Sequence, residues 1–98
     1  MRRGTNPIIT IKLNIDISLI DECYVTFKQK NVEIEKTVSD CSFENGCICV
    51  QLTQEETLSF VTKYPVLVQA RMKLSDGTIC ATDINKLVVG EIIKDGEI

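Results

Sequence analysis

Residues 66–81 read VLVQARMKLSDGTICA, and this stretch decides the fold class. Its first nine residues, Val66 to Leu74, give the longest unbroken alternation of side chains between two faces in the chain. One face is wholly apolar, while the other carries the polar residues of the stretch. A period of two is typical of a β-strand with one buried face, because successive side chains point to opposite faces. We therefore predict a central strand over residues 66–74.

The residues that follow predict a hairpin. Asp-Gly at positions 76–77 is typical of a two-residue type I′ turn. Such a turn places Ile79 opposite Leu74 and Ala81 opposite Met72 on the inner face.

The same register would bring two polar residues, Asp83 and Asn85, to the inner face before apolar character returns. An unpaired buried carboxylate is costly, so we expect the chain there to bulge or to be locally exposed rather than buried.

Strands are also predicted in the other half of the chain, where the same alternation recurs. The expected strands are residues 7–15, 23–29, 32–38 and 47–52. Charged residues in 32–38 favour an edge strand, entered through a two-residue turn at Lys30-Asn31. Residues 40–46 are interpreted as a polar connection that ends in the strong turn dipeptide Asn45-Gly46.

Helical signals are few. Thr53 with Glu56 fits a capping box, and the helix that it starts must end before Pro65, because the residue before a proline is disfavoured in helices. Residues 16–22 predict only a connecting helical turn, with Ser18 and Asp21 as a weak capping pair.

Composition agrees with an all-β chain. Val, Ile and Thr fill 31 of the 98 positions and Ala only two, and branched side chains suit a pleated surface. The length fits a single domain, residues 1–98, with short arms at 1–6 and 91–98. We predict an immunoglobulin-like antiparallel β-sandwich of about seven strands, with one short helical turn before the penultimate strand. A partly open barrel is the alternative architecture.

Charge and cysteine usage limit the partners and the compartment. A net charge of −3 with scattered basic residues provides no continuous track for a phosphate backbone, so we expect no nucleic-acid partner. Lys12 interrupts the first apolar run, and we predict neither a signal peptide nor a membrane span. Five cysteines at irregular spacings argue against a disulfide framework and favour reduced thiols in a cytosol.

The residues that could carry chemistry are sparse, since the chain contains no His. Cys47 and Cys49 are separated by one residue, whereas structural zinc sites use two to four and need further ligands, so ordinary packing is the better interpretation. The acidic pairs at 21–22 and 55–56 suit turn and helix starts. Arg71 and Lys73 are interpreted as a solvated strand face. We therefore predict no catalytic, cofactor-binding or metal-binding residues, no cofactor, and no enzymatic activity.

Several stretches carry a resemblance to a known family. They are RRGTNP at 2–7, DISLI at 16–20 leading to YVTFKQ at 24–29, LTQEET at 52–57, and VGEIIKDG at 89–96. With these, the chain resembles small prophage-encoded proteins of Gram-positive gut bacteria over nearly its whole length. That family is similar to the immunoglobulin-like N-terminal domain of phage baseplate upper proteins. The resemblance implies a virion- or tail-associated structural role and carries over no functional residues.

Three functional hypotheses follow. The first is a non-enzymatic structural or interaction protein of a phage or prophage assembly, which self-associates or binds another assembly subunit through its arms or the 32–38 edge. It implies a bacterial cytoplasmic location before assembly, with the virion as a candidate final location. The second is a binding module for a small ligand, a carbohydrate or a host protein, although the chain has no Trp for an aromatic platform. The third, an enzyme, has no catalytic constellation to support it.

Overall fold

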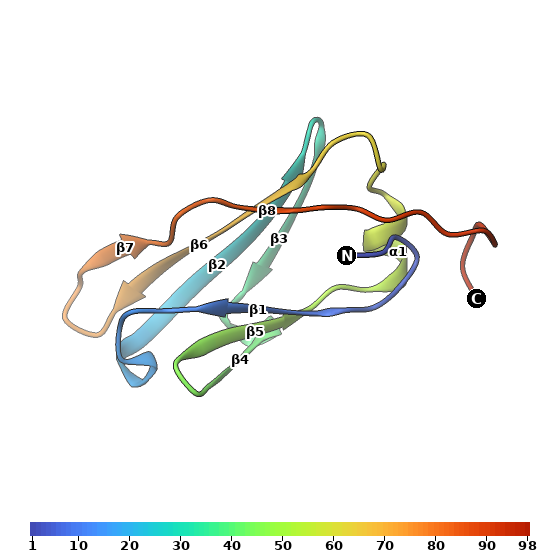
Figure 1. Ribbon diagram of the computed structural model, residues 1–98. Coiled ribbons are helices and arrows are strands. Elements are labelled where there is room, and N and C mark those ends of the chain that lie inside the picture. Colours follow the sequence, from blue (N-terminus) through green and yellow to red (C-terminus); the bar gives the residue numbers. More distant parts are fainter.

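A computed structural model describes residues 1–98 and consists mainly of two antiparallel β-sheets, with 48% strand and 11% helix. The three-stranded sheet has the order β1 (Ile8–Lys12), β5 (Cys47–Gln51), β4 (Cys41–Glu44). The five-stranded sheet has the order β3 (Val32–Thr37), β2 (Ile20–Gln29), β6 (Val66–Leu74), β7 (Ile79–Ala81), and β8 (Asn85–Leu87) pairs with β6 beside β7. Figure 1 shows the two sheets as separate layers. The predicted all-β, two-sheet fold is confirmed.

The core lies between the inner faces of the two sheets. The alternation predicted for the strands is confirmed there, since every second residue is buried from Cys23 to Gln29 in β2 and from Val66 to Met72 in β6. The cluster of buried apolar residues comprises Ile11, Leu13, Cys23, Val25, Phe27, Ile48, Val50, Leu52, Phe60, Val66, Val68, Ala70, Met72 and Val89. Burial of apolar area, at roughly 25 cal/mol per Å², is the main force that holds the sheets together.

The predictions of an edge strand at residues 32–38 and of a central strand at residues 66–74 are both confirmed. β3 is an edge strand of the five-stranded sheet, paired only with β2 through the turn at Lys30-Asn31. β6 is central, with β2 on one side and β7 and β8 along the other.

The prediction for residues 40–46 was right for the turn at Asn45-Gly46 and wrong for residues 41–44. Instead of a loop, the structure has the strand β4, which follows a 3-10 turn at Val38–Asp40 and pairs with β5 in a hairpin. Asn45 and Gly46 form its turn, with φ values of 52° and 74°. Four residues give too short an alternation to be recognised in the sequence, and the strand is stabilised by its ladder with β5. The structure has eight strands, β1–β8, where the sequence predicted about seven.

The predicted register of the β6–β7 hairpin was also wrong, by one residue. Lys73 pairs with Ile79 and Met72 with Cys80. The loop contains three residues, since Leu74 N donates to Thr78 O (2.8 Å) and Gly77 has a φ of 89°. A slip of one residue turns every side chain to the other face, so Cys80 faces inward and Ile79 is 57% exposed.

The helical turns have well-defined caps. Thr53 and Glu56 form the predicted capping box at the start of α1 (Gln54–Leu58), with bonds of 3.1 and 2.8 Å. The turn at Ile17–Leu19 is also present, but Asp16 caps it rather than the predicted pair, and its carboxylate accepts from Ser18 N (3.0 Å). None of the helices is long and apolar enough to cross a membrane.

Candidate functional site

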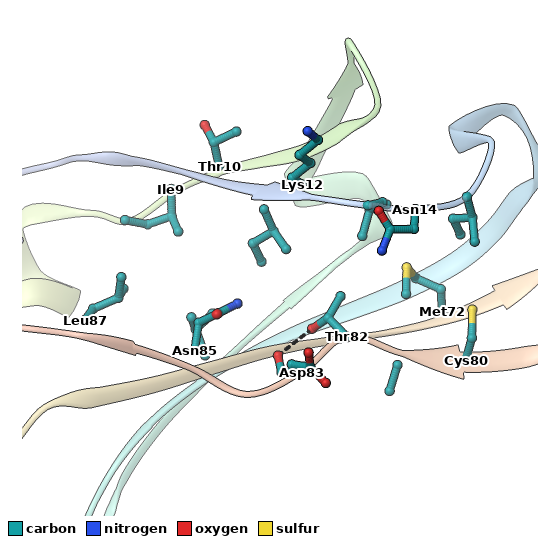
Figure 2. A pocket seen from close by; sticks show the side chains of 15 residues that line it. Ile9, Thr10, Lys12, Asn14, Met72, Cys80, Thr82, Asp83, Asn85 and Leu87 are labelled. Carbon is teal, nitrogen blue, oxygen red and sulfur yellow. Dashed lines mark hydrogen bonds between the residues drawn. The ribbon is translucent and has the colours of Figure 1, made fainter.

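A cleft of about 680 Å³ lies where the edges of the two sheets face each other. One wall is β1, the edge of the three-stranded sheet, and the other is the edge formed by β7 and β8 (Figure 2). Ile11, Leu13, Val68 and Met72 line the cleft and also belong to the core. The cleft is thus an opening onto the hydrophobic core between two sheet edges.

The β7/β8 wall is shaped by a change of register. Arg71 pairs with Ala81 in β7, whereas Val68 pairs with Asn85 in β8. Three residues therefore lie between the paired positions on this edge, but only two on β6. The extra residue makes the chain bulge between the two strands. Asp83 and Asn85 are exposed, as expected from the sequence.

Thr82 holds this bulge against β6 through hydrogen bonds. Its backbone N donates to Ala70 O (2.9 Å), and Ala70 N donates to its hydroxyl (3.1 Å). Gln69 Nε2 donates to the carbonyl of Thr82 (2.8 Å). Because both backbone and side-chain groups hold Thr82, the bulge is a fixed wall of the cleft.

The β1 wall carries unpaired backbone groups. Leu13 N donates to Gly46 O (2.9 Å) and Leu52 N donates to Pro7 O (3.0 Å), so the odd-numbered residues of this segment face β5. In an antiparallel ladder, alternate residues direct their N–H and C=O to opposite sides. The groups of Ile8, Thr10 and Lys12 therefore point to the free edge, where no other strand pairs with them.

The side chains of β1 divide between the two faces of its sheet. Ile9 and Ile11 pack against the core on the cleft side. Figure 2 shows Thr10 and Lys12 projecting away from the cleft. Ile8 shares that outer face and is 65% exposed. The titratable residues beside the cleft are Asp83, Cys80 and Lys12, the last with its side chain turned away from it, and no hydrogen bond joins the side chains of any two of them. The cleft thus offers apolar surface and unpaired backbone groups rather than a set of cooperating catalytic groups.

The cysteines lie in two places. Cys47 and Cys49 are on the outer face of β5, where the Cys49 thiol lies 3.9 Å from Glu44 Oε1. Cys23 and Cys41 come together between the sheets, with their Sγ atoms 4.0 Å apart. No sequence pattern indicates this second pair, because it depends on β4. No cluster of three or more His, Cys, Asp or Glu residues has the geometry to hold a metal ion.

The Cys23–Cys41 pair is a poor nucleophile. The pKa of Cys41 is raised to about 12. Burial is the largest cause, and the neighbouring Cys23 is the second. Burial also raises the pKa of Cys23, and its hydrogen bond with Cys41 opposes this. Both groups are therefore thiols at neutral pH, whereas a reactive cysteine is a thiolate.

The acidic pairs are placed apart from the cleft. Asp21 and Glu22 are exposed at the start of β2. Glu55 is exposed, and Glu56 completes the helix cap and forms an ion pair with Lys36 (2.9 Å). Arg71 and Lys73 lie exposed on the outer face of β6, as the sequence indicated.

The two arms are paired with each other. Residues 1–3 run beside residues 88–90, with Gly90 N donating to Met1 O (2.7 Å) and Arg3 N to Gly90 O (3.1 Å). The Arg3 guanidinium binds the carboxylates of Glu91 and Asp95 and two carbonyls at the end of α1. Figure 1 shows both arms near α1. The segments expected to bind a neighbour therefore have much of their polar surface occupied within the chain.

Neither the sequence, compared with protein-family models and curated proteins, nor the fold, compared with solved structures, gives a significant match.

Proposed function

We propose that the protein is a non-enzymatic interaction protein of a phage or prophage assembly, associated with the tail or baseplate, and that it binds a partner by strand addition at β1. The single observation that carries the proposal is the free edge of β1 beside an apolar cleft. An extended partner segment can satisfy unpaired backbone groups at such an edge while its alternate side chains fill pockets beside it. The sequence resemblance to prophage-encoded structural proteins supports the biological setting.

The architecture proposed for this role is an immunoglobulin-like sandwich. In that fold the sheets have the orders A-B-E-D and G-F-C, and variable-type domains add C′ beside C. The orders β1-β5-β4 and β3-β2-β6-β7 agree with B-E-D and C′-C-F-G, also in chain order. On this correspondence no strand occupies position A, which lies beside B. The cleft would then be the place of strand A, and a partner's strand would complete the sheet.

Purified virions provide the test of this role. After induction of a host that carries the gene in a prophage, mass spectrometry should detect the chain at a fixed ratio to tail proteins. The gene should also lie among tail, portal or terminase genes. Absence of the chain from virions and assembly intermediates, together with metabolic gene neighbours, would contradict the proposal.

A second candidate is a module that binds a small apolar ligand. The cleft volume favours it, because about 680 Å³ lies within the range of roughly 300–1,000 Å³ common for ligand pockets. A ligand of this kind would fill the cleft without protecting the amide groups at the free edge of β1. Hydrogen exchange at those amides therefore separates the two candidates.

A further inference from the structure

The free edge of β1 sets the register of any strand added there. The outward-pointing groups of Ile8, Thr10 and Lys12 form three sets of one donor and one acceptor. An antiparallel strand whose residues stand opposite these three can exchange up to six backbone hydrogen bonds with them. Its side chains at those positions point outward, and its intervening side chains point into the cleft.

The cleft determines which inward side chains fit. A strand beside β1 would place these side chains next to Ile9, Ile11 and Leu13 and against Leu87 of β8. Asp83, which carries the negative charge of the opposite wall, would repel an acidic side chain. Burial of apolar area and this repulsion both select uncharged apolar residues at the inward positions.

Lys12, on the outer face of β1, determines which residue of the partner segment fits opposite it. Lys12 is exposed and forms none of the ion pairs of the molecule. Its neighbour across the ladder is Cys47, which is not an acidic residue. Opposite charges directly across a ladder are favourable and like charges are not. An acidic side chain opposite Lys12 is therefore the preferred partner.

We propose that the cleft is a binding site for an extended segment of a partner protein, aligned antiparallel to β1, with apolar residues at alternate positions and an acidic residue opposite Lys12. The inference rests on the proposed function and specifies the chemistry of the partner. Read from its N-terminus, the segment has the pattern apolar-acidic-apolar-polar-apolar-polar. The first residue stands opposite Leu13 and the last opposite Ile8.

Synthetic peptides provide the direct test with the full-length protein. The probe is Val-Glu-Val-Thr-Val-Thr with blocked ends, and the controls are the same peptide with Lys for Glu and the scrambled Val-Val-Thr-Thr-Val-Glu. We expect the first to bind more tightly than either control in fluorescence anisotropy. Hydrogen exchange read residue by residue by NMR should show new protection at the amides of Ile8, Thr10 and Lys12.

Two proline variants test the edge. Thr10→Pro removes an N–H that points to the free edge and spares the ladder with β5, so the protein should fold and bind the probe about tenfold more weakly or worse. Glu35→Pro is the matched control on β3. The N–H of Thr37 bonds to Asp40 outside the ladder (2.9 Å), so Glu35, two residues earlier, also points its N–H outward. This variant should bind the probe normally.

Charge reversal tests the register. In Lys12→Glu the preference should invert, with the Glu peptide weakened about fivefold and the Lys peptide strengthened by a similar factor. If no peptide binds the folded wild type, or if Thr10→Pro and Glu35→Pro bind equally, the inferred site is wrong. The virion test of the assembly role stands independently of this result, because a structural subunit can assemble through another surface.

Discussion

Thr57 is a buried hydroxyl that joins the helical turn to the N-terminal arm. Its side chain is fully buried. Thr57 Oγ1 donates to Thr5 O (2.7 Å) and accepts from Thr5 N (3.1 Å). Both backbone groups of Thr5 thus depend on one side chain. Both bonds are partly buried, and polar groups that lose a partner there are costly, so this residue is expected to matter for stability beyond its size.

Replacement of Thr57 by Val keeps the shape and removes the hydroxyl. We expect the free energy of unfolding to fall by about 1–3 kcal/mol, because the polar groups of Thr5 are left without that partner. Thr62→Val, at an exposed position, is the control and should change it by no more than about 0.5 kcal/mol. Urea denaturation followed by circular dichroism gives both values. Equal effects would mean that the bonds to Thr5 contribute no net stability.

The lowered pKa of the Glu56 carboxyl predicts that the stability of the protein depends on pH. Burial raises the pKa of its carboxyl, but hydrogen bonds to Lys36 and to the backbone of Thr53 outweigh this and hold the pKa below its usual value. A carboxyl whose pKa is lowered on folding stabilises the protein above its unfolded pKa, and that contribution disappears as pH falls through the folded pKa.

Glu56→Gln should therefore reduce stability at about pH 7 and reduce it less at about pH 3, because the wild-type carboxyl takes up its proton as the pH falls through its folded-state pKa. Glutamine can still complete a capping box, so the variant isolates the charge. Glu55→Gln, at an exposed neighbour outside any ion pair, is the control and should have little effect at both pH values. Unfolding curves at several pH values measure the difference, and a constant loss across that range would contradict the assignment.

At the scale of elements, the hairpin between β6 and β7 shows how a turn sets the exposure of a whole strand. The three-residue loop turns Cys80 toward Met72 and the core and leaves Ile79 at the surface. A two-residue turn at Asp76-Gly77 would have done the reverse. The two registers therefore predict opposite sensitivities for two adjacent residues.

Matched asparagine variants distinguish these registers. Cys80→Asn should lower the free energy of unfolding by about 1–3 kcal/mol, because it brings an amide to the inner face of the sheet. Ile79→Asn should change it by no more than about 0.5 kcal/mol, since this side chain is more than half exposed. If Ile79→Asn is the more damaging substitution, the hairpin has the two-residue register in solution.

At the scale of the whole molecule, the arms close the end of the sandwich beside α1. Deletion of residues 91–98 removes the ion pairs of Arg3 with Glu91 and Asp95 (3.2 and 3.1 Å) and the bonds of Gln54 to Ile98. These groups lie mostly at the surface, where such pairs contribute about 0–1 kcal/mol. We expect a small loss of thermal stability and unchanged binding of the peptide probe at β1.

The same deletion tests the alternative in which the arms themselves bind a neighbour. Ile93 and Ile98 are fully exposed, so the C-terminal arm retains apolar surface that such binding could use. If the truncated protein keeps its stability and its peptide binding but no longer enters virions, the arms rather than the β1 edge carry the assembly contact.

The sequence by itself determined most of the strands, their inward faces and the main helical cap. These features depend on local signals: the period of two in Val66–Leu74, the capping box at Thr53, and the turn residues Asn45-Gly46. It also indicated the exposed interruption near Asp83, because burial of a lone carboxylate there would have been too costly.

Only the tertiary structure decided the strand β4, the register of β7, the meeting of Cys23 with Cys41, and the cleft beside β1. Four residues such as Cys41–Glu44 have too little pattern of their own and become a strand because β5 provides a ladder. The cleft depends on how two sheet edges from opposite ends of the chain are placed against each other. Its essential groups are backbone N–H and C=O, which every sequence has and no motif identifies.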